Sequence, residues 1–147
     1  MAASRNSLSA DLEQRVGDFL ATRLGPGAKL CVGLSGGCDS VVLLRILHQL
    51  GFGSSISAIH VHHGLSPHAN SWAEFCRGLC LRLGVPLCVR HVAVDPQNGL
   101  GLEAAARQVR YAAFAECATD NLLLAQHRGD QAETLLLNLL RGAGVTG

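Results

Sequence analysis

The chain has few aromatic residues and little net charge. Phe, Trp and Tyr make up 4% of its 147 residues, and the formal net charge at pH 7 is +1. A near-neutral balance does not mark a nucleic-acid or membrane partner, although it leaves room for a local basic patch. Apolar runs are shorter than the about 20 residues that a membrane-spanning helix needs, and the polar start Met1–Ser7 lacks the apolar stretch of a secretion signal. We therefore expect a soluble, cytoplasmic protein with no membrane partner.

Paired cysteine motifs are also absent. The six cysteines never have the Cys-x-x-Cys spacing that is typical of many zinc and redox sites; they are Cys31, Cys38, Cys76, Cys80, Cys88 and Cys117. They lie in apolar periodic segments, which predicts reduced thiols that pack as small hydrophobic groups.

Apolar segments that alternate with turn residues predict an α/β protein. With 48% hydrophobic residues, the chain suffices for one domain, which we take as residues 1–147. Trp72 is expected in its core. The patterns predict helices over residues 8–24, 41–50, 72–83, 103–117 and 130–140, and strands over 29–34, 56–61, 87–94 and 121–125. This order favours a doubly wound parallel sheet with helices on both faces. The glycine-rich residues 141–147 predict that a fifth strand follows, so that the domain is incomplete at its carboxyl end.

The segment Ser35–Ser40, Ser-Gly-Gly-Cys-Asp-Ser, lies between the first predicted strand and the next helix. Its glycines let backbone N–H groups approach a ligand, and a helix N-terminus favours an anion such as phosphate. The serine hydroxyls add donors, and Asp39 suits a magnesium ion. Because no lysine is present to reach terminal phosphates, we expect chemistry between the α and β phosphates. The alternative is a plain turn in which Asp39 or Ser40 caps the helix.

These residues match the Ser-Gly-Gly-x-Asp-Ser signature, and the chain resembles the N-type ATP pyrophosphatases, or PP-loop proteins. Within them it is most similar to the tRNA(Ile)-lysidine synthetase family. The matching motifs follow in order from residue 29 to the end: His60–Leu65, Glu103–Tyr111, Asp130–Leu135 and Leu139–Gly144.

The resemblance implies an ATP- and Mg²⁺-dependent ligase. It would adenylate C2 of the wobble cytidine in the CAU anticodon of tRNA(Ile) and join L-lysine there to form lysidine, releasing AMP and pyrophosphate. A homodimer stays open, and no tRNA-binding domain is visible. One alternative is an ATP-binding module without catalysis. Another is a different PP-loop tRNA-modifying enzyme, although cytidine thiolases of this class carry the Cys-x-x-Cys pairs that this chain lacks.

The resemblance also implies that the first strand lies beside the fourth, so that the glycine loop and residues 126–131 face one crevice. The residues expected to bind ATP are Ser35, Gly36, Gly37, Cys38, Asp39, Ser40, His60 and Val61. Those expected to act in catalysis are Asp39, His127, Asp130 and Arg110, of which Asp39 and Asp130 would hold the metal. Gln126 and Gly129 depart from the family's usual His-His-x-Asp-Asp-Gln run, so that one histidine and one aspartate are absent; if that aspartate contributes to magnesium binding, activity would be weak and Asp130 would serve alone. An alternative role for Asp130 is to cap the last helix.

Two other groups of side chains bear on this site. Arg107 and Arg110 share a helix face that suits phosphate or ribose, with a solvated face as the alternative, and Glu103 is expected to pair with Arg107. Strand alternation turns His60 and His62 to the same face. That arrangement allows a metal site, but no carboxylate or cysteine ligand is nearby in sequence, so a metal is disfavoured. The resemblance implies instead that this strand end lies near the adenine and ribose, with backbone groups of residues 58–61 contacting the base.

Overall fold

The computed structural model describes residues 2–95, 99, 101–117 and 119–126, with side chains from residue 10 onward. Its strands are β1 (Leu30–Gly33), β2 (Ile56–His62), β3 (Leu87–His91) and β4 (Asn121–Leu123). They form one parallel sheet in the order β3-β2-β1-β4, with β1 central and buried at every residue. The predicted parallel α/β sheet and the pairing of the first strand with the fourth are both confirmed.

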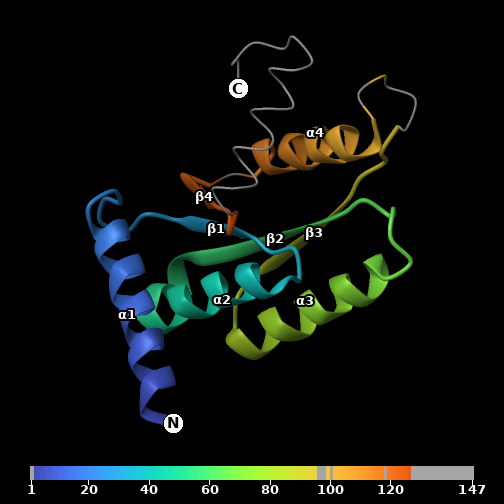
Figure 1. The fold of residues 1–147 in the computed structure, drawn as a ribbon. Helices are drawn as coiled ribbons and strands as arrows, with labels where there is room; N and C mark the ends of the chain where they lie inside the picture. The colour runs from blue at the N-terminus through green and yellow to red at the C-terminus, as the bar shows by residue number, and fades with distance from the viewer. Residues whose placement is uncertain (1, 96–98, 100, 118, 127–147) are drawn as a thin grey trace.

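Helices cover both faces of this sheet (Figure 1). On one face lie α1 (Ala2–Ala21), α2 (Cys38–Leu47) and α3 (Ala69–Leu83), and on the other lies α4 (Leu102–Ala115). The larger core includes Leu20 of α1, Leu44 of α2 and Leu79 of α3, packed against the sheet. The smaller core joins Phe114 of α4 to the opposite side of β1 and β2. The layers are those of a doubly wound fold.

The ends of several elements differ from their predicted positions. The helix α2 begins at Cys38, three residues before its predicted start, so it includes the end of the glycine loop. It continues into a π-helical turn, His48–Phe52, where Gly51 has φ 86°, and a short 3-10 turn, Gly53–Ser55. The helix predicted over residues 130–140 lies outside the described residues. No helix in the described part of the chain combines the length and apolarity needed to cross a bilayer.

The inward face of α3 is made of small residues. Ala69, Ala73, Cys76 and Cys80 are buried at spacings of four, three and four, together with Leu79. This packing brings the helix close to the sheet and leaves Trp72 and Phe75 at the flank, 43% and 45% exposed. The prediction that Trp72 belongs to the core is therefore wrong.

The cysteines divide into packed and exposed thiols. Cys31, Cys76 and Cys80 are buried as predicted, whereas Cys38 and Cys88 are exposed. Cys38 is exposed because it begins α2 at the loop, and Cys88 lies on β3, at the edge of the described sheet. For these two the predicted packing role is wrong.

Candidate functional site

The glycine loop leaves the carboxyl end of the central strand. The Leu34 N–H donates to the Ile59 carbonyl at 2.8 Å, which extends the contact between β1 and β2 by one residue beyond the strand. Gly36 then adopts φ 89°, a conformation that L side chains rarely adopt. A Cβ at this position would lie 3.5 Å from Cys76 Sγ and 3.6 Å from Trp72 Cβ. The loop therefore lies against α3 and turns its backbone toward the crevice.

Internal hydrogen bonds fix the shape of this loop. The Ser40 hydroxyl donates to the Gly37 carbonyl at 2.9 Å, and the Ser35 and Ser40 oxygens lie 3.1 Å apart. Ser35 Oγ also accepts the Gly37 N–H at 3.2 Å. Because Ser40 uses its proton on Gly37, the Ser35 hydroxyl donates to Ser40. Both serine protons are thus used in hydrogen bonds within the loop. The backbone N–H groups of the first turn of α2, which helix geometry leaves without a partner inside the helix, are the donors that remain for an anion.

The capping alternative for this segment is wrong. The N-cap of α2 is Gly37, with extended φ and ψ of −74° and 159° and no side-chain capping bond. Asp39 lies in the first turn of the helix and is exposed, and Ser40 is buried behind it. The loop thus has the backbone form of an anion site.

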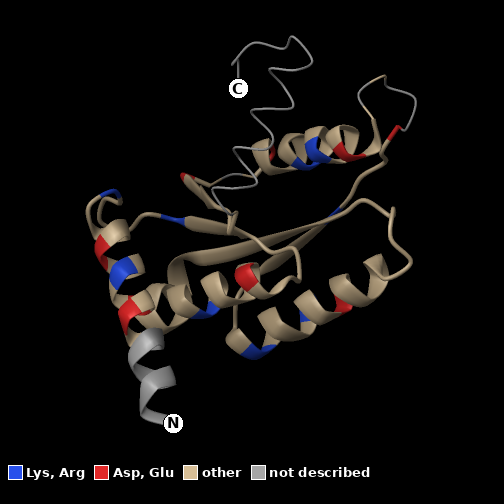
Figure 2. Cartoon of the chain, in the orientation of Figure 1, with Lys and Arg blue, Asp and Glu red and all other residues tan. Residues whose placement is uncertain are grey.

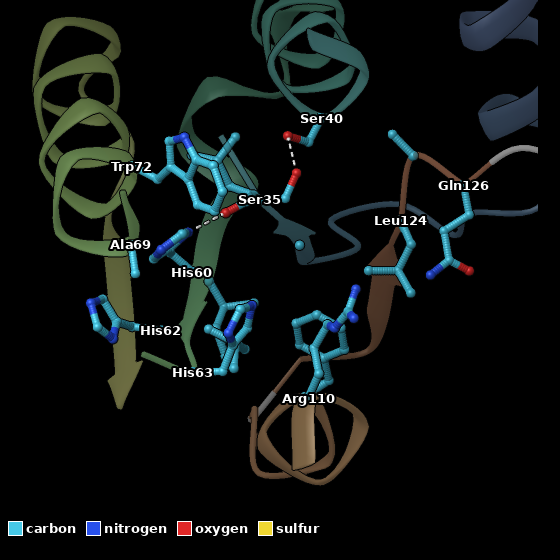
Figure 3. A pocket seen from close by; sticks show the side chains of 16 residues that line it. Ser35, Ser40, His60, His62, His63, Ala69, Trp72, Arg110, Leu124 and Gln126 are labelled. Carbon is cyan, nitrogen blue, oxygen red and sulfur yellow. Dashed lines mark hydrogen bonds between the residues drawn. The ribbon is translucent and has the colours of Figure 1, made fainter. Parts of the chain in front are cut away.

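A cavity of about 210 Å³ opens beside the loop, at the point where the strand order reverses. Figure 3 shows side chains converging on it from the loop, β2, α3, α4 and the end of β4. Ligands of doubly wound proteins bind at such a switch point. The residues predicted for the site that line the cavity are Ser35, Ser40, His60, Val61 and Arg110, and His63, Trp72, Leu124 and Gln126 join them.

The buried ring of His60 contacts the backbone just before the loop. Its Nδ1 lies 2.8 Å from the carbonyl oxygen of Leu34, the residue before the loop. Burial lowers the pKa of His60, so the neutral ring donates this proton. Cys76 Sγ contacts the same carbonyl at 3.8 Å and the ring at 3.6 Å, and burial raises the pKa of its thiol to about 11. His60 is therefore a support for the loop as well as part of the cavity wall.

Metal binding by the histidines at the end of β2 has no support in the geometry of the described residues. His62 Nε2 lies 2.9 Å from Asn70 Oδ1, and its ring stacks near His91 at 4.6 Å between centroids. Within the described residues no group of three His, Cys, Asp or Glu side chains is placed to hold a metal ion. Packing and hydrogen bonding account for His60 and His62.

Arg110 places a positive charge on the α4 wall of the cavity. Its Nε is buried and has no hydrogen-bond partner among the described residues. Across the cavity, burial and the Arg110 charge lower the pKa of His63 (Figure 3). Arg110 lines the cavity, and the terminal N–H groups of a guanidinium suit phosphate oxygens.

The other arginine of this helix turns away. The Arg107 guanidinium lies 4.9 Å from the centre of the Tyr111 ring, and no ion pair to Glu103 is found in the described part of the chain. The predicted pair is therefore wrong, since Arg107 contacts the ring one turn later on α4. His127 and Asp130 lie outside the described residues.

The donor set fits a magnesium ion held largely by phosphate. Mg²⁺ commonly takes one or two carboxylates and fills its remaining positions with phosphate oxygens and water. Asp39 is the carboxylate that the loop supplies, exposed in the first turn of α2. Figure 2 shows acidic and basic residues interspersed along the described helices.

Comparisons with known proteins identify the family of the chain. The chain is 55% identical over 121 residues to a tRNA(Ile)-lysidine synthase of Neisseria meningitidis serogroup B, covering 81% of the chain and 28% of that protein. It is 42% identical over 149 residues to the tRNA(Ile)-lysidine synthase of Nitrosomonas europaea, covering 100% of the chain and 32% of that protein. The chain thus spans about a third or less of the length of these relatives.

Two solved structures share the fold. One is the U34-tRNA thiolase NcsA from Methanococcus maripaludis with its [4Fe-4S] cluster, with a TM-score of 0.65 and 20% identity over 92% of this chain and 52% of that one. The other is the NH3-dependent NAD synthetase from Campylobacter jejuni, with a TM-score of 0.60 and 16% identity over 95% of this chain and 60% of that one. The model of the PP-loop domain, an ATP-binding domain, matches residues 8–147. With its loop at the switch point of a parallel sheet, the chain belongs to the PP-loop domain family.

Proposed function

We propose that this chain is the ATP-binding domain of a tRNA(Ile)-lysidine synthase. The observation that carries the proposal is the cavity beside the glycine loop, which Ser35 and Ser40 line from the loop and the start of α2 and Arg110 lines from α4. Relatives of that name at 42% and 55% identity support the choice of reaction. Residues 1–147 would form one domain of the enzyme.

The reaction would proceed in two steps at this cavity. The C2 oxygen of the wobble cytidine attacks the α-phosphorus of ATP, the bond to the β-phosphate breaks and pyrophosphate leaves. The lysine amine then attacks C2, and AMP departs with the former C2 oxygen. Both steps replace one bond by another without a change of oxidation state, and the second releases the proton of the amine.

Each wall of the cavity has a role in this proposal. The loop amides hold the pyrophosphate, Arg110 binds phosphate oxygens, and backbone groups near His60 and Val61 at the end of β2 bind the adenine. A magnesium ion held by Asp39 and Asp130 would neutralise the phosphate charge. His127 would donate to developing charge or carry a proton.

The direct test is product analysis. The chain is incubated with labelled ATP, Mg²⁺, lysine and a tRNA(Ile) with a CAU anticodon, and AMP is separated from ADP. Pyrophosphate formed only with tRNA, and AMP formed only with tRNA and lysine, would support the proposal, and ADP would overturn it. ATP binding without turnover would instead favour the ATP-binding module. In a parallel incubation with a sulfur donor in place of lysine, AMP formed with tRNA would indicate another tRNA-modifying activity.

A matched pair of arginine variants tests the site itself. Arg110→Gln removes the guanidinium from the cavity, and we expect ATP affinity to fall about ten- to hundredfold, the range of a charge-assisted hydrogen bond. Arg82→Gln, on the exposed last turn of α3, serves as the control. Equal ATP affinities for the two variants, measured by titration calorimetry, would exclude Arg110 from the phosphate site.

A further inference from the structure

A chain of hydrogen bonds runs from α4 to the end of β4. Arg107 Nη2 donates to the Tyr111 hydroxyl oxygen at 3.3 Å, and the Tyr111 hydroxyl donates to Gln126 Oε1 at 3.3 Å. The directions are consistent because arginine has no acceptor, so the tyrosine oxygen must accept and its proton remains to donate. The Gln126 carboxamide is thereby held by its oxygen.

Packing holds the middle of this chain in place. The Arg107 guanidinium lies over the Tyr111 ring at 4.9 Å. The same ring meets Phe114 edge-on, with 5.9 Å between centroids, and Phe114 belongs to the smaller buried core. The Tyr111 hydroxyl therefore has a fixed position relative to the sheet, although the residue is exposed at the surface.

The free end of the chain faces the cavity. Gln126 lines the cavity, and in Figure 3 its carboxamide nitrogen lies on the side of Arg110 while its oxygen points away. Since Tyr111 occupies the oxygen, the N–H₂ group is the part of Gln126 left for a ligand. Polarisation along the chain makes these N–H groups better donors.

We infer that Gln126 binds a phosphate oxygen of the nucleotide, and that Tyr111 and Arg107 are positioning residues that hold its carboxamide in the donor orientation. The inference rests on the proposed ATP site. Its basis is that the two polar side chains on the α4 and β4 wall, Arg110 and Gln126, both carry N–H donors, and that Tyr111 contacts the oxygen of the Gln126 carboxamide, so that its N–H₂ group is the end on the side of Arg110.

Nucleotide affinity tests this inference in the full chain. Tyr111→Phe keeps the ring contacts and removes the hydroxyl, and Gln126→Met keeps the length of the side chain and removes its donor. Because the bonds within the chain are long for their type, we expect Tyr111→Phe to weaken ATP binding about three- to tenfold, as one uncharged hydrogen bond would. Gln126→Met removes a donor to a charged oxygen and should weaken it by about tenfold or more. The double variant should be no weaker than Gln126→Met, and adenosine binding should not change. Gln108→Met, on the exposed face of α4, is the control.

The results separate this inference from the proposed function. ATP affinity within about twofold of the unmodified chain in Tyr111→Phe would refute the positioning role. An equal loss for adenosine would overturn the assignment to phosphate. The Gln126 carboxamide signal in the NMR spectrum, identified by its absence in Gln126→Met, should move in Tyr111→Phe without nucleotide. An unmoved signal would refute the hydrogen-bond chain, whereas failure of the unmodified chain to bind ATP would refute the proposed function.

Discussion

The buried ring of His60 makes the stability of the fold depend on pH. Its Nδ1–H donates to the Leu34 carbonyl, and burial lowers its pKa below the ordinary 6.5, with smaller contributions from the charges of His62, His63 and Arg77. The unfolded chain therefore takes up a proton on acidification before the folded chain does. Stability from this group is complete above about pH 6.5 and is lost as the pH falls below it.

The expected size follows from one proton. If His60 stays neutral in the folded chain at about pH 5.5, the free energy of unfolding falls by at most about 1.4 kcal/mol between about pH 7.5 and 5.5. A folded-state pKa within this window gives a smaller loss. The variant His60→Asn removes the titration but places an amide N–H near the position of Nδ1, so its bond to Leu34 is retained.

Urea denaturation at the two pH values measures the difference. Because burial and the charge of Arg110 also lower the pKa of His63, both proteins carry His63→Gln. On acidification, the free energy of unfolding should fall more in the protein with His60 than in the protein with His60→Asn. Any cost of the smaller side chain that does not depend on pH cancels in this comparison. The same change with pH in both proteins would show that His60 is protonated as readily in the fold as in the unfolded chain.

Three further predictions concern the loop and the strand before it. Gly33→Ala would place its Cβ 2.4 Å from Leu124 Cδ2, and we expect about 1–3 kcal/mol of destabilisation by urea denaturation, because the leucine must move; an unchanged midpoint would contradict this. Gly36→Ala and Gly27→Ala each place a side chain at a residue with positive φ, so each should lower the free energy of unfolding by about 1–2 kcal/mol. Only Gly36→Ala should also weaken ATP binding. Asp39→Ala should abolish magnesium-dependent ATP binding with the circular dichroism spectrum unchanged; unaltered affinity would remove Asp39 from the metal site.

Periodicity and turn residues were sufficient to predict the layers of this fold. Alternating apolar runs and amphipathic segments report burial directly, so the four strands and the helices between them could be read from the sequence. Helix boundaries were harder to predict. Cys38 and Asp39 already form the first turn of α2, but these loop residues are polar or small and give no periodic signal.

Side-chain direction limited the prediction of the site. Trp72 has helical spacing with the residues predicted for the core. The residues that α3 buries are instead mainly alanines and thiols. Which face of the helix packs against the sheet is decided by packing in three dimensions, which spacing alone does not give. Arg107 and Glu103 have the spacing of an ion pair, yet an aromatic ring one turn later takes the guanidinium. The presence of His63 and Gln126 in the cavity wall depends on where β2 and β4 end relative to α4.

The two walls of the cavity differ in how firmly they are held. The loop follows β1, which is central and wholly buried, whereas Gln126 follows β4, three half-buried residues at the edge of the described sheet. Local opening costs least at such an edge, so β4 can separate from β1 while the other strands stay paired. Backbone amides of Leu122 and Leu123 should therefore exchange with deuterium faster than those of β1. A nucleotide that contacts both walls would slow this exchange. Part of its binding free energy would go into keeping β4 paired with β1.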